Sequence, residues 1–124
     1  MIKYSLLNMD SFYIYANSGY TRQSKTIRLE GEWEVAVTQI HIENNNTSPR
    51  HFAIVANCVD TSCVNDTSLP ILRWAHSLKT EFTNLYYKPV TLIHLSYIDV
   101  HLLNHTLEPT KLNILDLVLH FRKR

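Results

Sequence analysis

The sequence is poor in charged residues. Aspartate, glutamate, lysine and arginine make up 19% of its 124 residues, below the roughly 25% that is typical of soluble domains. A small domain has proportionally more surface and should need more charge. The deficit fits a surface rich in serine, threonine and asparagine. Interface cores are also depleted of charge, and we favour a surface that partner chains partly cover. The net charge of +1 gives no basic field, which argues against nucleic acid as a partner.

Long hydrophobic runs are also absent. No run approaches the roughly 20 apolar residues of a membrane span, and the opening segment Met1–Ser5 lacks the apolar core of a signal peptide. We therefore expect no membrane partner, and a protein that is made in the host cytosol and not secreted. In that reducing compartment Cys58 and Cys63 are expected to be free thiols, with a bridge between them as the open alternative. Their spacing is not the Cys-x-x-Cys of a redox or zinc site.

Glycine is nearly absent, because only Gly19 and Gly31 occur in the whole chain. No internal repeat, low-complexity stretch or linker divides the sequence, so residues 1–124 are predicted to form a single domain. Its turns must be made by asparagine, aspartate, serine and proline. Clusters of these residues occur at Asn44–Pro49, Asn65–Ser68 and Asn104–Pro109.

The segments between these turns have the composition and period of β-strands. They predict an all-β domain, an antiparallel eight-stranded β-sandwich. The only stretch that could form a short helix is Ala75–Phe82. The eight segments are Phe12–Tyr15, Lys25–Leu29, Trp33–Ile42, Phe52–Ala56, Leu69–Trp74, Leu85–Val90, Leu95–Leu103 and Leu112–Phe121.

Two segments allow predictions of which side chains face the core. In the third segment the apolar positions change parity after Val37, which predicts a β-bulge near Thr38 and Gln39. Trp33 should be the large core anchor at the start of that strand. In the last segment one face is predicted to carry the apolar residues and the other the polar residues. The apolar set is Leu115, Leu117, Leu119 and Phe121, and the polar set is Asp116, His120 and Arg122.

Catalytic motifs are missing. No nucleophile motif, glycine-rich phosphate loop or paired-carboxylate signature occurs. We therefore predict no enzyme activity and assign no catalytic, cofactor-binding or metal-binding residues. His101 and His105 have ligand spacing only on a helix, whereas here they lie at a strand end and in a turn. Glu32 and Glu34 share one strand face, which predicts a solvated charged surface. The basic ending Arg122–Arg124 is expected to aid solubility.

One segment resembles a known family. Leu29–Ile40 is similar to the L-x-G-x-W-E-V-x-L-x-E-I stretch of jelly-roll structural proteins of Polinton/Maverick elements and related DNA viruses. The family's members are longer and carry an acid where this chain has Gln39. Later segments resemble the family in the same order, namely Phe52–Val59, Leu69–Arg73, Tyr97–Val100 and Leu117–Arg122.

The resemblance implies a single jelly roll that serves as a small minor or vertex capsid subunit in the virion. Its partners would be copies of itself, in a pentamer before a trimer, and other capsid proteins. It would have no small-molecule substrate. Contacts could use aromatic anchors at Tyr13, Tyr15, Tyr86 and Tyr87. The alternative is a ligand- or receptor-binding β-sandwich, such as a spike head or a carbohydrate-binding module, for which Trp74, Tyr86 and Tyr87 are the candidates.

Overall fold

The computed structural model describes residues 10–43, 51–64, 66–110 and 112–124. The described residues are 66% strand and contain no helix, so the all-β prediction is confirmed. The stretch Ala75–Phe82 contains the end of one strand and the short strand after it. The strands are β1 Ser11–Ala16, β2 Gly19–Arg28, β3 Trp33–Ile42, β4 Phe52–Ala56, β5 Ser62–Val64, β6 Thr67–Leu69, β7 Ile71–Ala75, β8 Lys79–Glu81, β9 Lys88–Pro89, β10 His94–Asn104 and β11 Ile114–Lys123.

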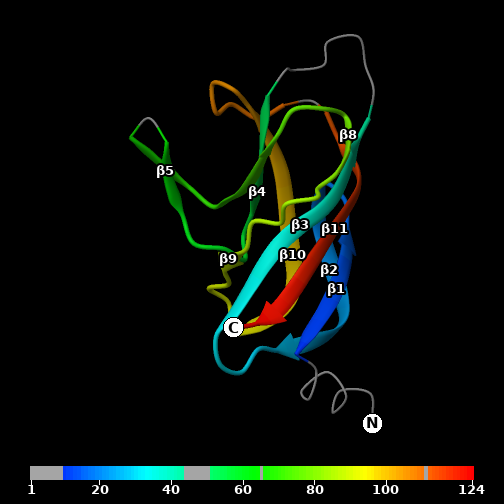
Figure 1. The fold of residues 1–124 in the computed structure, drawn as a ribbon, viewed down its shortest axis with the longest axis vertical. Coiled ribbons are helices and arrows are strands. Elements are labelled where there is room, and N and C mark those ends of the chain that lie inside the picture. The colour runs from blue at the N-terminus through cyan, green and yellow to red at the C-terminus, as the bar shows by residue number, and fades with distance from the viewer. Residues whose placement is uncertain (1–9, 44–50, 65, 111) are drawn as a thin grey trace.

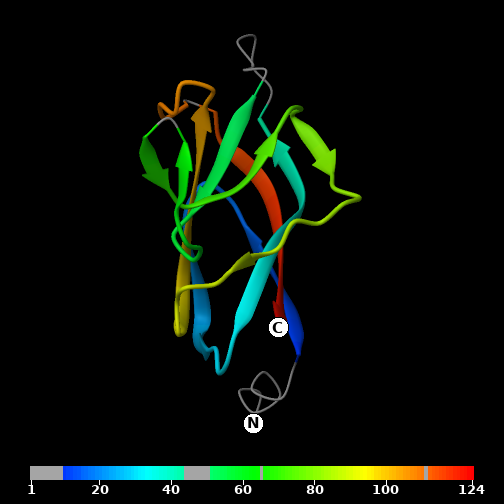
Figure 2. The ribbon, with the colours of Figure 1, turned by 60° about the vertical axis from the view of Figure 1, so that its left-hand side comes forward.

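The strands form two main antiparallel sheets and a small hairpin (Figure 1). The first sheet has the order β1-β11-β3-β8, with β9 also paired to β3, and the second has the order β2-β10-β4-β7. Figure 2 shows the two sheets as separate layers, with the β5–β6 hairpin outside the second. Buried side chains from both sheets form one core cluster, as in a β-sandwich. In the described part of the chain, no helix is long and apolar enough to cross a membrane.

The predicted bulge in β3 is present. Val118 of β11 pairs with Gln39, and the next residue, Leu119, pairs with Val37, so Thr38 is the extra residue. Its hydroxyl donates a hydrogen bond to the Val118 carbonyl at 3.2 Å. Val35 and Val37 before the bulge are at odd positions, and Ile40 and Ile42 after it are at even ones. The extra residue keeps both pairs in the core.

A second bulge, in β11, overturns one predicted orientation. Ile114 pairs with Ile42 but Asp116 pairs with His41, so Leu115 is left without an opposite residue. Leu115 is 47% exposed, whereas Ile114 is 2% exposed and belongs to the core. The assignment of Leu115 to the apolar face was therefore wrong. The later part of that face is confirmed, because Leu117, Leu119 and Phe121 are buried.

The β5–β6 hairpin explains why β4 is apolar on both faces. Every residue of β4 is buried. Ala53 and Val55 belong to a second buried cluster with Ile71 and Leu103, separate from the main core. Val64 of β5 and Leu69 of β6, together with Trp74, pack against that cluster. The expected strand Leu69–Trp74 is divided at Pro70, since Leu69 ends β6 and Ile71 begins β7.

The turn after β10 has the predicted chemistry, whereas the last two residues of the expected turn Asn65–Ser68 belong to β6. The Asn104 side-chain oxygen accepts hydrogen bonds from the backbone N–H groups of Thr106 and Glu108, at 2.9 and 3.0 Å. Gly31, between β2 and β3, has a φ of +83°, which favours glycine. The expected turn at Asn44–Pro49 lies outside the described residues. The expected strand Leu85–Val90 is reduced to β9, which lies at the edge of the first sheet beside β3.

Candidate functional site

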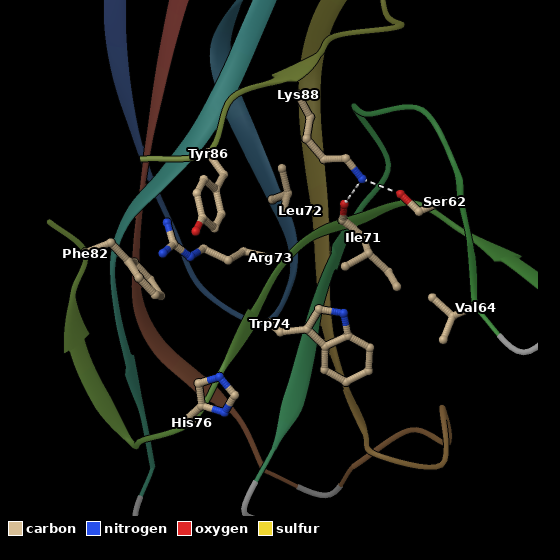
Figure 3. Close-up of a pocket in the computed structure, with 10 residues that line it drawn as sticks. All are labelled: Ser62, Val64, Ile71, Leu72, Arg73, Trp74, His76, Phe82, Tyr86 and Lys88. Atoms are coloured by element: carbon tan, nitrogen blue, oxygen red, sulfur yellow. Dashed lines mark hydrogen bonds between the residues drawn. The ribbon is translucent and has the colours of Figure 1, made fainter. Parts of the chain in front are cut away.

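A pocket of about 600 Å³ lies beside β7, the outer strand of the second sheet (Figure 3). The β5–β6 hairpin forms one of its walls, and the chain from His76 to Lys88 forms another. Most of the lining is apolar or aromatic. The residues that line it are Ser62, Val64, Ile71, Leu72, Arg73, Trp74, His76, Phe82, Tyr86 and Lys88.

Arg73 is held in the pocket by two aromatic rings. Its guanidinium carbon lies 3.9 Å from the centre of the Phe82 ring and 4.3 Å from the centre of the Tyr86 ring. Both distances are within the range of cation–π attraction. Its Nη1 also donates a hydrogen bond to the Asn84 carbonyl at 2.5 Å. These three contacts fix the orientation of a side chain that would otherwise be mobile.

Lys88 brings a second positive charge from β9. Its Nζ donates hydrogen bonds to the Ser62 hydroxyl at 2.5 Å and to the Ile71 carbonyl at 2.6 Å (Figure 3). The ammonium group therefore links β9 to the hairpin and to β7. Burial lowers the pKa of Lys88, and the Asp60 carboxylate offsets part of that effect.

The pocket has an uneven distribution of charge. Arg73 and Lys88 line it, but no aspartate or glutamate does. Among the described residues, neither Arg73 nor Lys88 forms an ion pair. A partly desolvated cation gains most from an anionic partner. The arrangement is therefore suited to binding an anion and unsuited to binding a metal cation.

A different kind of surface covers the outer face of the first sheet. Alternate residues of β1 are buried, which places Tyr13 and Tyr15 on the outer face, 59% and 73% exposed. The Tyr13 ring stacks on His120 of β11, with ring centres 4.6 Å apart. The Tyr87 hydroxyl lies 2.8 Å from Nδ1 of the same histidine. Arg122 lies over the Tyr87 ring, 3.5 Å from its centre.

Two of the polar groups considered from the sequence, Glu34 and His101, have structural partners. Glu34 is only 16% exposed at its side chain and pairs with Arg122 at 2.6 Å and with Arg124 at 3.6 Å. His101 lies 2.7 Å from the Asp99 carboxylate. In the described ranges, no group of three or more histidine, cysteine, aspartate or glutamate side chains could hold a metal ion.

The two cysteines are free and differ in environment. Cys58 is buried, and burial raises the pKa of its thiol to about 12, so this thiol stays protonated. Cys63, on β5, is exposed. The two thiols therefore differ in their access to solvent and do not form a bridge.

Comparisons with known proteins identify no relative. No family model, no curated protein and no solved structure matches the chain.

The structure divides the aromatic residues that the sequence singled out. Trp74 and Tyr86 line the pocket together, whereas Tyr87 lies on the outer face of the first sheet. Sequence reasoning did not identify Arg73 or Lys88. The available signal was a basic residue beside an aromatic one in both segments, Arg73–Trp74 and Tyr87–Lys88.

Proposed function

We propose that the chain is a single-jelly-roll subunit of a viral shell, and that it acts by assembling with copies of itself and with other capsid proteins. The strand order is the observation that carries the proposal. The short strands β8 and β9 both pair with β3, so together they occupy one strand position of the sandwich. The β5–β6 hairpin forms a sheet of its own and is treated as an insertion. Eight positions then remain, as in a jelly roll.

The pairing of these eight positions is nested. The first pairs with the eighth (β1 with β11), the second with the seventh (β2 with β10), the third with the sixth (β3 with β8 or β9), and the fourth with the fifth (β4 with β7). This is the pattern of one long hairpin. Successive pairs lie in alternate sheets, as they do when such a hairpin is wound around the core. The winding supports the jelly-roll architecture that the resemblance of Leu29–Ile40 implies.

An architecture alone does not establish a function, so the second support is a surface. β1 is an outer strand of the first sheet, and its two tyrosines lie side by side along the strand with little covering them. Exposed strand edges are sites of association unless they are protected. Tyrosine is enriched where interfaces concentrate their binding energy. The low charged fraction of the whole chain also favours a surface that partner chains partly cover.

The expected assembly is a closed ring within the virion, because identical subunits usually associate with closed symmetry. Five copies are favoured over three, because the vertex proteins of such shells lie on five-fold axes. Each contact should bury at least about 1,000 Å² to be specific.

Sedimentation of the purified chain at several micromolar concentrations tests the proposal. The parent should sediment as a ring, and Tyr15→Ser should shift it toward the monomer. Ile93→Ser is the matched control, because Ile93 is exposed to a similar extent but lies between β9 and β10, away from the tyrosine face. The control should sediment as the parent does. A parent that stays monomeric and also fails to enter particles with its companion proteins would refute assembly.

A further inference from the structure

We propose that the pocket beside β7 binds a small carboxylate whose body is flat and apolar, such as an aromatic acid. This inference goes beyond assembly and does not depend on it, because the pocket and the tyrosine face of β1 are formed by different residues. The ligand would be bound and not converted, since the lining holds no constellation for catalysis.

The size and lining of the pocket fit a small molecule. Its volume of about 600 Å³ is within the roughly 300–1,000 Å³ of small-molecule sites, which are mostly apolar with a few polar groups. The Trp74 indole and the side chains of Val64 and Ile71 provide an apolar wall (Figure 3). A flat hydrocarbon body would gain dispersion contacts and lose its contact with water there.

The stacked arginine determines which part of the ligand must be anionic. The rings of Phe82 and Tyr86 lie over the Arg73 guanidinium, so its edge is the part that can receive a ligand. A guanidinium has five N–H donors in its plane, and in the described part of the chain only the hydrogen bond to Asn84 uses one. A planar carboxylate matches that edge with two parallel hydrogen bonds.

The second cation strengthens the preference for an anion. Lys88 has three N–H donors, and Ser62 and Ile71 accept two of them, both as neutral groups. The third donor and the positive charge remain for a ligand. A neutral sugar could stack on Trp74 but would form an ion pair with neither cation. A cationic ligand would be repelled by them.

Calorimetric titration with two compounds of equal shape tests the proposal. One is 2-naphthoate, which carries the carboxylate, and the other is 2-naphthamide, which has the same rings and no charge. Naphthoate should bind one per chain and at least about tenfold more tightly than the amide, as expected for a charge-assisted hydrogen-bond pair. Arg73→Gln and Lys88→Gln should each reduce this ratio toward one while the amide still binds. Lys79→Gln, at an exposed lysine of β8 outside the pocket lining, should leave the ratio unchanged.

Several outcomes would overturn the inference. Equal affinities for the two compounds in the parent would exclude a site that selects for the carboxylate. The absence of saturable naphthoate binding would exclude the site itself. If circular dichroism shows that either pocket variant is unfolded, the inference is tested by the affinities of the two compounds for the parent. Sedimentation of the parent with and without naphthoate keeps the result separate from the test of assembly.

Discussion

The Tyr87 hydroxyl lies 2.8 Å from Nδ1 of His120 and joins the segment after β8 to the central strand β11. A neutral imidazole can accept this hydrogen bond at Nδ1, whereas a protonated one cannot. Burial lowers the pKa of His120 from 6.5, and the neighbouring Arg122 charge lowers it further. The fold therefore favours the neutral form of this side chain.

Stability is expected to fall with acid because of His120. Its folded pKa is below its unfolded value of 6.5, so between these two values the unfolded state binds more protons. Stability then rises with pH across that window and falls as the pH decreases through it. In urea denaturation from about pH 7.5 to about pH 5, His120→Gln should reduce the loss of stability seen in the parent. His105→Gln, at an exposed histidine in the turn after β10, should not. If the free energy of unfolding depends on pH equally in all three proteins, groups other than His120 cause the acid sensitivity.

Trp33→Ala should destabilise the domain by about 3–5 kcal/mol, as other large-to-small core changes do. Trp33 is 6% exposed, its ring centre lies 5.4 Å from that of Phe12, and its Nε1 donates a hydrogen bond to the Glu30 carbonyl at 2.9 Å. Trp74→Ala is the comparison, because Trp74 is half-buried at the pocket and packs on the smaller cluster. It should cost clearly less in the free energy of unfolding measured in urea. A Trp33 variant as stable as the Trp74 variant would contradict its place in the main core.

The cysteines should differ in reactivity toward a thiol reagent. One thiol per native chain, that of Cys63, should react rapidly at neutral pH, and the second only after denaturation. Cys58 is buried and stays protonated, so it has neither access nor thiolate character. Cys63→Ser should abolish the rapid reaction with little change in stability. Cys58→Ser should cost about 1–3 kcal/mol, because it places a hydroxyl in the core. A native chain with no reactive thiol would indicate a bridge instead.

The sequence was informative where a strand's apolar period was unambiguous. In β3 the polar pair Thr38–Gln39 separates two apolar series, so the change of parity exposed the bulge directly. In β11, Ile114 and Leu115 are both apolar and adjacent, so either could be assigned to the core. Pairing with β3 decides between them, and that pairing is a long-range property.

The hairpin and the pocket were less accessible to sequence reasoning. β5 and β6 have three residues each, which is too few to show a strand periodicity. Trp74 and Tyr86 were recognised as aromatic residues suited to binding. The cations beside them depend on the contact of β7 with the chain after β8, which no local pattern encodes. Both cations lie in segments where a basic residue follows or precedes an aromatic one, which is too common a pattern to indicate a site alone.

The bulge in β11 makes opposite predictions for two adjacent residues of similar size. Ile114→Ala should cost about 2–5 kcal/mol, because it leaves a cavity in the main core. Leu115→Ala should stay within about 0.5 kcal/mol of the parent, as surface substitutions usually do. Urea denaturation of the two variants gives this comparison, and similar slopes with denaturant would show that their unfolded states are alike. A strand with regular alternation through this point would reverse the order, because Leu115 would then share the buried face with Leu117. A larger loss for Leu115→Ala than for Ile114→Ala would therefore place the extra residue of β11 elsewhere.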